Sequence, residues 1–247
     1  MANDALTKVP AVTLGFWIIK ILATTFGETA GDTLSMSFNF GYLASTAVFG
    51  ILLAGLIGAQ IKAMEFKPFL YWATIIASTT AGTTMADFAT RSLGIGYTGG
   101  SLVLLASVLG SLAVWHRAMG TISVSSVREP RAEIFYWVTI TLSQTLGTAL
   151  GDWVADGTLG YLGAAVIFGG LLVLMAAAYY RTAISHVALF WAAFVLTRPL
   201  GAVVGDFLDK PITHGGLELS RGWASAVLAL AIGLLIVTIP QRAGKAH

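Results

Sequence analysis

The sequence predicts an all-α integral membrane protein with eight transmembrane helices, built from four tandem two-helix repeats with pseudo-symmetry about the membrane normal. Three observations predict this fold class. Only 11% of the 247 residues are charged, whereas soluble domains carry about 25%. The mean hydropathy is +0.81. A Trp, a Gly and an Asp recur at fixed offsets in four successive blocks of the chain.

The composition excludes several classes of function. A soluble protein of 25.9 kDa could not cover its surface with so few charges, so we exclude a cytosolic enzyme, a nucleic-acid binder and a disordered protein. The chain has no Cys, which removes disulfides, thiolate metal sites and Cys nucleophiles. Its 28 Gly residues are typical of closely packed membrane helices.

Eight apolar segments lie between charged or turn-rich breaks. Most reach the ~20 residues that a helix needs to cross the ~30 Å hydrocarbon core. They are continuously apolar, whereas the strands of a membrane barrel alternate over ~10 residues, so helices are predicted. The predicted spans are residues 11–38, 41–61, 68–93, 97–115, 133–157, 161–180, 185–208 and 219–239.

The basic residues predict the orientation in the membrane. One set of connections is rich in Lys and Arg, whereas the other holds only Arg91, Lys210 and Arg221. The richer side is expected to be cytoplasmic, which places both ends of the chain there. The first ten residues are polar and no signal-peptide cleavage site follows them, so we expect the first span to be retained.

A single membrane domain is expected over residues 1–247. A cytoplasmic loop at residues 116–132 divides it into two halves of four spans each. The predicted repeats cover residues 11–61, 68–115, 133–180 and 185–239.

The repeat has three fixed positions. An acid follows each repeated Trp by fifteen residues, and a Gly precedes each acid by five. Because every repeat has two spans, all four insert in the same direction and their acids lie at one depth. Fifteen helical residues rise roughly 22 Å, so the acids are expected near the external ends. The Trp residues are expected near the cytoplasmic ends, for interfacial anchoring and packing rather than for binding a substrate. The Trp positions are Trp17, Trp72, Trp137 and Trp191; the glycines are Gly27, Gly82, Gly147 and Gly201; the acids are Asp32, Asp87, Asp152 and Asp206.

Two of the repeats concentrate negative charge. Glu28 precedes Asp32 by four residues, and Asp156 follows Asp152 by four, so the members of each pair share a helix face. Such like charges repel unless a cation or a proton lies between them. Carboxylates in or near a membrane are costly and mark ion paths or proton relays. Repeats one and three are therefore expected to carry the net negative charge.

The even repeats differ, because a basic residue follows each acid by four positions. Asp87 is followed by Arg91, and Asp206 by Lys210, which predicts self-neutralising pairs and a supporting role. Arg198 lies within a span and needs an acidic partner.

An oxygen-only ligand set favours the hard cations Mn²⁺, Mg²⁺ and Ca²⁺ over Zn²⁺ and copper, and no organic cofactor is expected. A proton or Na⁺ site stays open. The predicted metal ligands are Glu28, Asp32, Asp87, Asp152, Asp156 and Asp206. The predicted supporting residues are Thr25, Gly27, Gly82, Arg91, Gln144, Gly147, Arg198, Gly201 and Lys210.

Simpler interpretations exist for several of these residues. The acids can be solvated at the membrane interface, and Asp209 is interpreted as a solvated loop acid. Lys20 is expected to extend its amine toward the cytoplasmic interface. The motif glycines are interpreted as close helix contacts rather than hinges.

The repeats resemble a family of bacterial inner-membrane proteins made of four tandem two-span repeats of unknown function, each with a characteristic Trp. The resemblance covers about residues 11–239. It is carried by the stretches TTFGETAGD, TTAGTTMADFATRSLGIGYTGG, TLGTALGDWVADGTLGYLG and TRPLGAVVGDFLDK. It implies eight spans, a multi-pass protein of the bacterial inner membrane, and metal-responsive transport with manganese export as the specific expectation. The fourth repeat departs from the pattern at Pro199 and after Asp209.

Three functions are therefore weighed. The leading hypothesis is a gradient-driven transporter of a divalent cation, Mn²⁺ above all. The alternatives are a proton-coupled carrier of a small organic solute or cation, and a membrane scaffold without transport. No nucleophile–base pair, HExxH motif or phosphate-binding loop is found, so no enzymatic activity is expected. The expected partners are the lipid bilayer and a small cation, with a homo-oligomer left open.

Overall fold

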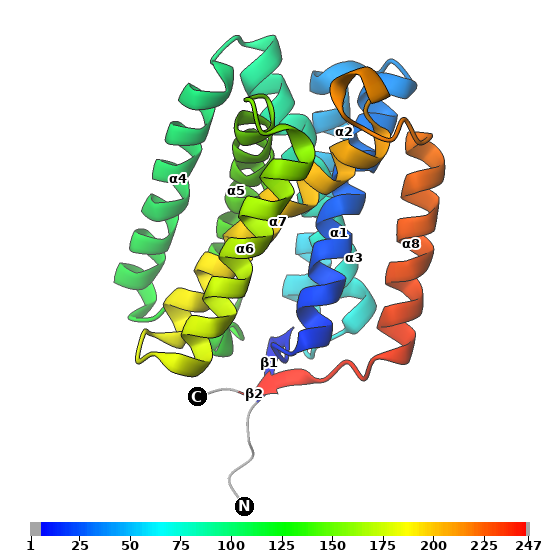
Figure 1. Cartoon of the computed structure of the whole chain (residues 1–247). Helices are drawn as coiled ribbons and strands as arrows, with labels where there is room; N and C mark the ends of the chain where they lie inside the picture. Colours follow the sequence, from blue (N-terminus) through cyan, green and yellow to red (C-terminus); the bar gives the residue numbers. More distant parts are fainter. Residues whose placement is uncertain (1–5, 246–247) are drawn as a thin grey trace, which may run out of the picture.

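A computed structural model describes residues 6–245, which form eight long α-helices and one pair of short strands (Figure 1). The eight predicted spans correspond to these helices, and π-helical turns at Thr33–Ser37 and Phe88–Ser92 extend the first and third. The helices are α1 (Leu14–Asp32), α2 (Gly41–Lys62), α3 (Pro68–Asp87), α4 (Gly96–Met119), α5 (Pro130–Ala155), α6 (Gly160–Arg181), α7 (His186–Asp209) and α8 (Arg221–Thr238).

The odd-numbered helices begin at clear local signals. Thr13 and Ser185 are the N-caps of α1 and α7, and each side chain accepts a hydrogen bond from a backbone N–H of the first turn. Pro68 and Pro130 are the first residues of α3 and α5, where the missing N–H of proline costs nothing.

The odd-numbered helices form an inner ring. Helix α1 packs against α3 and α7, and α5 packs against the same two helices. The even-numbered helices lie outside, with α2 on α3, α4 on α5, α6 on α7 and α8 on α1. Figure 1 shows α4, α6 and α8 on the outside of the bundle. Each outer helix thus covers the inner helix of the following repeat, and the contact of α8 with α1 closes the ring.

The outer helices have the character of membrane spans. Five helices, α2, α4, α6, α7 and α8, are long and apolar enough to cross a membrane. The inner helices α1, α3 and α5 carry many more polar side chains, most of them buried inside the bundle. An apolar shell around a polar interior indicates a membrane protein, because a soluble protein distributes these residues the other way round.

Glycines bring the inner helices into close contact, as predicted. In each case a Cβ on the motif glycine would collide with a residue of the next repeat around the ring. That residue stands three positions before the motif glycine of its own repeat. These are close helix contacts of the kind that small residues permit. The pairs are Gly27 with Thr79, Gly82 with Gln144, Gly147 with Arg198 and Gly201 with Thr24.

The repeated Trp residues pack into the interior of the bundle. Trp72, Trp137 and Trp191 are buried, and Trp17 is partly buried. The ring centroid of Trp72 lies 5.5 Å from that of Phe16, inside one aromatic cluster. This burial agrees with the packing part of the predicted role, and the anchoring part stays a prediction. The Trp residues stand on inner helices, which the outer helices separate from the surroundings.

The two ends of the described chain meet. Strand β1 (Leu6–Pro10) pairs antiparallel with β2 (Ala243–Lys245) at the lower end of the bundle in Figure 1. Lys8 in β1 extends its Nζ to within 2.5 Å of Glu133 Oε1 on α5. Neither the strands nor this ion pair was expected from the sequence. The connection predicted at residues 116–132 is also shorter, because α4 continues to Met119 and α5 begins at Pro130.

We expect Gly201→Ala to destabilise the protein. Its new Cβ would lie within 2.8 Å of the Thr24 backbone carbon, and overpacking of this kind costs about 1–3 kcal/mol. Gly110→Ala on α4 is the matched control, since that position has nothing within 4 Å. Thermal unfolding in detergent measures both variants. Equal melting temperatures for Gly201→Ala and Gly110→Ala would contradict the close contact.

Candidate functional site

Side chains at every fourth position of the inner helices line the axis of the bundle. Four residues make about one helical turn, so positions with this spacing share one face. On α1 they are Lys20, Thr24, Glu28 and Asp32, all of them buried. Their burial shows that this face of the helix turns toward the other inner helices, as the cross-helix contacts described below confirm.

The four repeated aspartates lie at the upper end of this axis. Asp32 and Asp87 are the last residues of α1 and α3, while Asp152 and Asp206 lie in the last turns of α5 and α7. All four are buried. The upper end therefore has a layer of four carboxylates, which we call the acid layer. The repeat analysis predicted these acids together at one level, at the opposite end from the Trp residues.

Arg91 joins two members of the acid layer. Its Nε lies 2.9 Å from Asp87 Oδ1, and its Nη2 lies 3.0 Å from Asp152 Oδ2. The guanidinium also lies over the rings of Tyr42 and Tyr97, 6.0 and 5.9 Å from their centroids. The two carboxylates compensate the cost of placing this charge in a largely buried position. Arg91 thus connects α3 with α5 as a permanent cation.

Lys210 joins the other two members. Its Nζ lies 2.5 Å from Asp32 Oδ2, 3.0 Å from Asp206 Oδ1 and 3.9 Å from Asp209 Oδ1. Arg221 reaches the same group, with its Nε 3.3 Å from Asp209 Oδ2. Burial alone would lower the pKa of Lys210, but the three carboxylates raise it well above its usual value. Lys210 is therefore a cation that connects α7 with α1.

These two contacts correct the predicted distribution of charge. Arg91 and Lys210 do pair with the acids of their own repeats, as expected from the spacing. Each also reaches the acid of the next repeat, Asp152 or Asp32. Repeats one and three therefore do not carry uncompensated charge in this layer. The spacing along one helix could not indicate this, because the second partner comes from a neighbouring helix.

Arg198 has the acidic partner that the sequence predicted. Its Nη2 lies 2.9 Å from Glu28 Oε2 and also donates to the hydroxyls of Thr83 and Thr148. Its Nη1 donates to the backbone carbonyl of Thr24 at 3.5 Å. The guanidinium is fully buried. Residues from α1, α3 and α5 thus converge on one side chain of α7.

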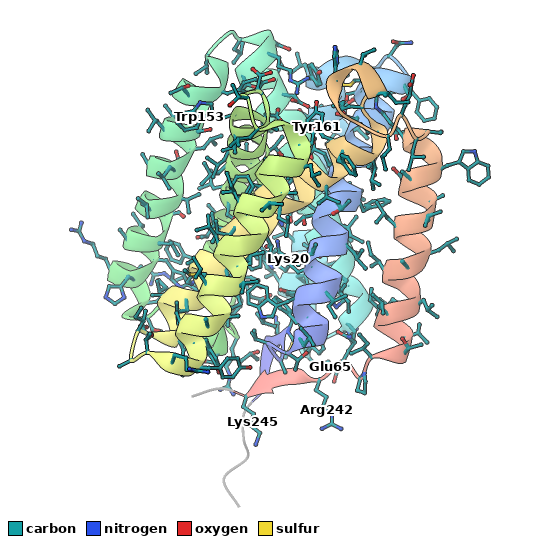
Figure 2. The ribbon with its side chains drawn as sticks, in the orientation of Figure 1. Lys20, Glu65, Trp153, Tyr161, Arg242 and Lys245 are labelled. Atoms are coloured by element: carbon teal, nitrogen blue, oxygen red, sulfur yellow. The ribbon has the colours of Figure 1, made fainter. Side chains whose placement is uncertain are left out.

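Lys20 lies deeper on the same axis, in the middle of the bundle (Figure 2), contrary to expectation. It is 0% exposed, its Nζ donates to Thr197 Oγ1 at 3.2 Å, and it lies 4.1 Å from the centroid of the Phe194 ring. Among the described residues no carboxylate lies within ion-pair distance of it. The prediction that Lys20 extends to the interface is wrong. The signal that could have found it is its spacing of eight residues before Glu28.

Three carboxylates have the geometry of a candidate metal site. Glu28, Asp32 and Asp206 each offer one oxygen, and these oxygens lie within 4.8 Å of one another. Asp209, predicted to be a solvated loop acid, is instead buried beside them in the last turn of α7. Asp156, predicted as a ligand, is exposed at the C-cap of α5. The end of α5 turns it away from the axis.

Several polar groups of the interior have no hydrogen-bond partner among the described residues. Both amide atoms of Gln144 are buried and unpartnered, as are Asp32 Oδ1 and both oxygens of Asp209. Buried polar groups are normally satisfied, so these atoms are the ones in the interior that still lack a partner such as water or an ion. Thr25, predicted as a supporting residue, instead donates to the Ile21 carbonyl of its own helix.

We expect Arg198→Met to destabilise the protein strongly, because it leaves the Glu28 carboxylate buried without its partner. Breaking a buried ion pair costs about 3–5 kcal/mol. Adding Glu28→Gln removes the uncompensated charge and should recover part of that loss. Thermal unfolding in detergent compares the single and double variants. A double variant that is no more stable than Arg198→Met would contradict the pairing.

Comparison with known proteins gives a family and no more. No curated protein and no solved structure matches the chain. A family described as Repeat of Unknown Function (DUF347) matches four times, at residues 15–65, 70–121, 135–185 and 189–239. These matches follow the four repeats described above and cover most of the sequence. The chain therefore belongs to the DUF347 repeat family.

Proposed function

We propose that the protein is a gradient-driven membrane transporter of a divalent cation, with Mn²⁺ in the export direction as the favoured substrate. The convergence of Glu28, Asp32 and Asp206 carries the proposal, because their oxygens lie within 4.8 Å of one another. Two ligands on opposite sides of a hard cation, each at about 2.0–2.6 Å, are about 4–5 Å apart. One such ion can therefore bridge the three buried carboxylates.

The ligand chemistry supports the same class of ion. All candidate ligands are carboxylate oxygens, which suit Mn²⁺, Mg²⁺ and Ca²⁺ better than Zn²⁺ or copper. A carboxylate must be ionised to bind a cation, so protons compete with the metal and affinity falls as the pH is lowered. Protons can then serve as the counter-ion, and the gradient supplies the energy.

The proposal includes eight membrane-spanning helices related by an axis along the membrane normal. The cyclic packing of each outer helix on the next inner helix supports that arrangement. It also explains why α1, α3 and α5 can be polar and still cross the membrane, since the outer helices separate them from lipid. We also propose that the β1–β2 end faces the cytoplasmic side of a bacterial inner membrane, because the connections at that end are the richer in Lys and Arg.

The axis below the site favours a carrier over an open pore. Arg198 and Lys20 place two positive side chains between the acid layer and the lower end. Below them the hydroxyls of Tyr71 and Tyr136 meet at 2.6 Å within the buried aromatic cluster. A cation cannot follow this axis without meeting like charge and closely packed rings. Transport then requires the inner helices to rearrange around the site, as in alternating access.

We expect Asp32→Asn to abolish Mn²⁺ transport, because it replaces a negatively charged carboxylate ligand with a neutral amide. Loss of even an outer-shell partner weakens metal binding about 10–100-fold, so loss of a ligand should cost at least as much. Uptake of Mn²⁺ into proteoliposomes measures the effect. Asp156→Asn is the matched control, since that acid is exposed and outside the group. Wild-type rates for Asp32→Asn would show that the site is assigned wrongly.

A second candidate function has one specific observation in its favour. The guanidinium of Arg91 is held by two carboxylates and lies over two tyrosine rings, which is the chemistry that recognises an organic cation. A proton-coupled carrier of a small organic cation could use the same groups. Isothermal titration with Mn²⁺ and with guanidinium distinguishes the two candidates. Binding of guanidinium without binding of Mn²⁺ would favour the organic-cation carrier. Normal growth of cells whose protein carries Asn in place of the repeated aspartates would favour a scaffold without transport.

A further inference from the structure

We propose that the ammonium group of Lys210 occupies the cation position of the carboxylate site, and that a divalent cation binds by displacing it. This inference rests on the proposed function, because it describes how the same site changes between its empty and its occupied state. It assigns to Lys210 the part of a tethered competitor, which is more specific than the supporting ion pair that the sequence indicated.

The position of Nζ is the first argument. It lies 2.5 Å from Asp32 and 3.0 Å from Asp206, which are two of the three carboxylates with metal-site spacing. These distances are those of an ammonium surrounded by its oxygen ligands. A divalent cation bound to the same oxygens would lie within a few ångströms of Nζ and repel it strongly. The two cations therefore exclude each other.

The unused oxygens are a second and independent argument. Lys210 has at most three protons to donate, and it leaves Asp32 Oδ1 without a partner among the described residues. The two oxygens of Asp209 have ion-pair contacts at 3.9 and 3.3 Å and no hydrogen bond among the described residues. These atoms are buried, and an unsatisfied buried oxygen costs free energy. A metal ion with six or more oxygen ligands can use such atoms, whereas one ammonium cannot.

The charges around the site give a third argument. Four carboxylates, Glu28, Asp32, Asp206 and Asp209, face three positive side chains. The three cations are Arg198, Lys210 and Arg221. When Lys210 leaves, the remaining groups carry two net negative charges. One divalent cation neutralises these two charges, so the exchange leaves no excess charge in the buried site.

The surrounding chain allows the side chain of Lys210 to move while its backbone stays fixed. Its N–H donates to Asp206 O, and its carbonyl accepts from Glu218 N, both at 2.9 Å. Gly216 lies so close to this carbonyl that a Cβ there would reach it at 2.1 Å. The side chain, 12% exposed, lies near the upper end and has a flexible four-carbon stem. It can therefore turn outward without unfolding the loop.

The departure of the fourth repeat from the common pattern has a physical explanation in this arrangement. The other three repeats place a Gly-Tyr pair after the acid, whereas the fourth has the segment 210–219, which folds back on the end of α7. In that segment Leu217 N donates to Phe207 O at 2.7 Å, and Leu219 N donates to Leu208 O at 2.9 Å. These bonds hold the backbone that carries Lys210 beside the acids.

Binding of Mn²⁺ to the purified full-length protein in detergent tests the inference. We expect Lys210→Met to bind Mn²⁺ at least about tenfold more tightly than the wild type. If Lys210 occupies the site for about nine tenths of the time or more, only about a tenth of the wild-type protein is free to bind Mn²⁺, and the apparent affinity falls by the same factor. The electron paramagnetic resonance signal of free Mn²⁺ measures this affinity. Lys62→Met is the matched control, because Lys62 is exposed at the end of α2, and its affinity should equal that of the wild type.

A second measurement needs no substitution and applies even if Lys210→Met fails to fold. An amine-reactive reagent followed by mass spectrometry should label Lys210 faster when Mn²⁺ is present, because the displaced side chain enters solvent. Labelling of Lys62 should not change. Equal Mn²⁺ affinity in wild type and Lys210→Met, or unchanged labelling of Lys210 in protein that binds Mn²⁺, would overturn the inference and leave the proposed function standing. No Mn²⁺ binding by wild type or Lys210→Met would overturn both.

Discussion

The four inner helices depend on one buried guanidinium. Arg198 on α7 reaches the Glu28 carboxylate and the Thr24 carbonyl of α1, the Thr83 hydroxyl of α3 and the Thr148 hydroxyl of α5. A buried arginine is costly unless its charge and its donors are satisfied, and only this arrangement of all four helices supplies the partners. The pair therefore selects one register of the inner ring, and the positions of the remaining polar groups follow from it.

The register also depends on glycine, because polar side chains can meet across the axis only if the helix backbones approach closely. Gly147 provides the space for Arg198 itself, since a Cβ there would lie 2.2 Å from the arginine Cγ. A motif glycine allows the same close approach at each of the four contacts between neighbouring inner helices. Association of helices in a membrane relies on close packing and interhelical hydrogen bonds rather than on burial of apolar surface. Both contributions coincide here at the same level of the bundle.

The charges above Arg198 form two clamps. Arg91 holds α3 to α5, and Lys210 holds α7 to α1. The clamps differ in chemistry, since a guanidinium is a rigid fork stacked against rings, whereas an ammonium is a point charge on a flexible stem. The lower end differs again, because the aromatic cluster and the paired terminal strands close it. The two ends of the inner ring are therefore different in kind, with paired charges at one end and packed rings at the other.

The sequence by itself determined the four repeats, the eight helices, the common level of the aspartates and the close contacts of the glycines. All of these follow from spacing along one helix, which fixes the face and the height of a side chain. Only the tertiary structure decided that Lys210 reaches Asp32, that three of the four repeated Trp residues are buried, and that Lys20 lies on the axis. Asp156 shares the spacing of a ligand but is exposed at the end of α5. These outcomes depend on which helix follows which around the ring, and offsets within one repeat carry no information about that order.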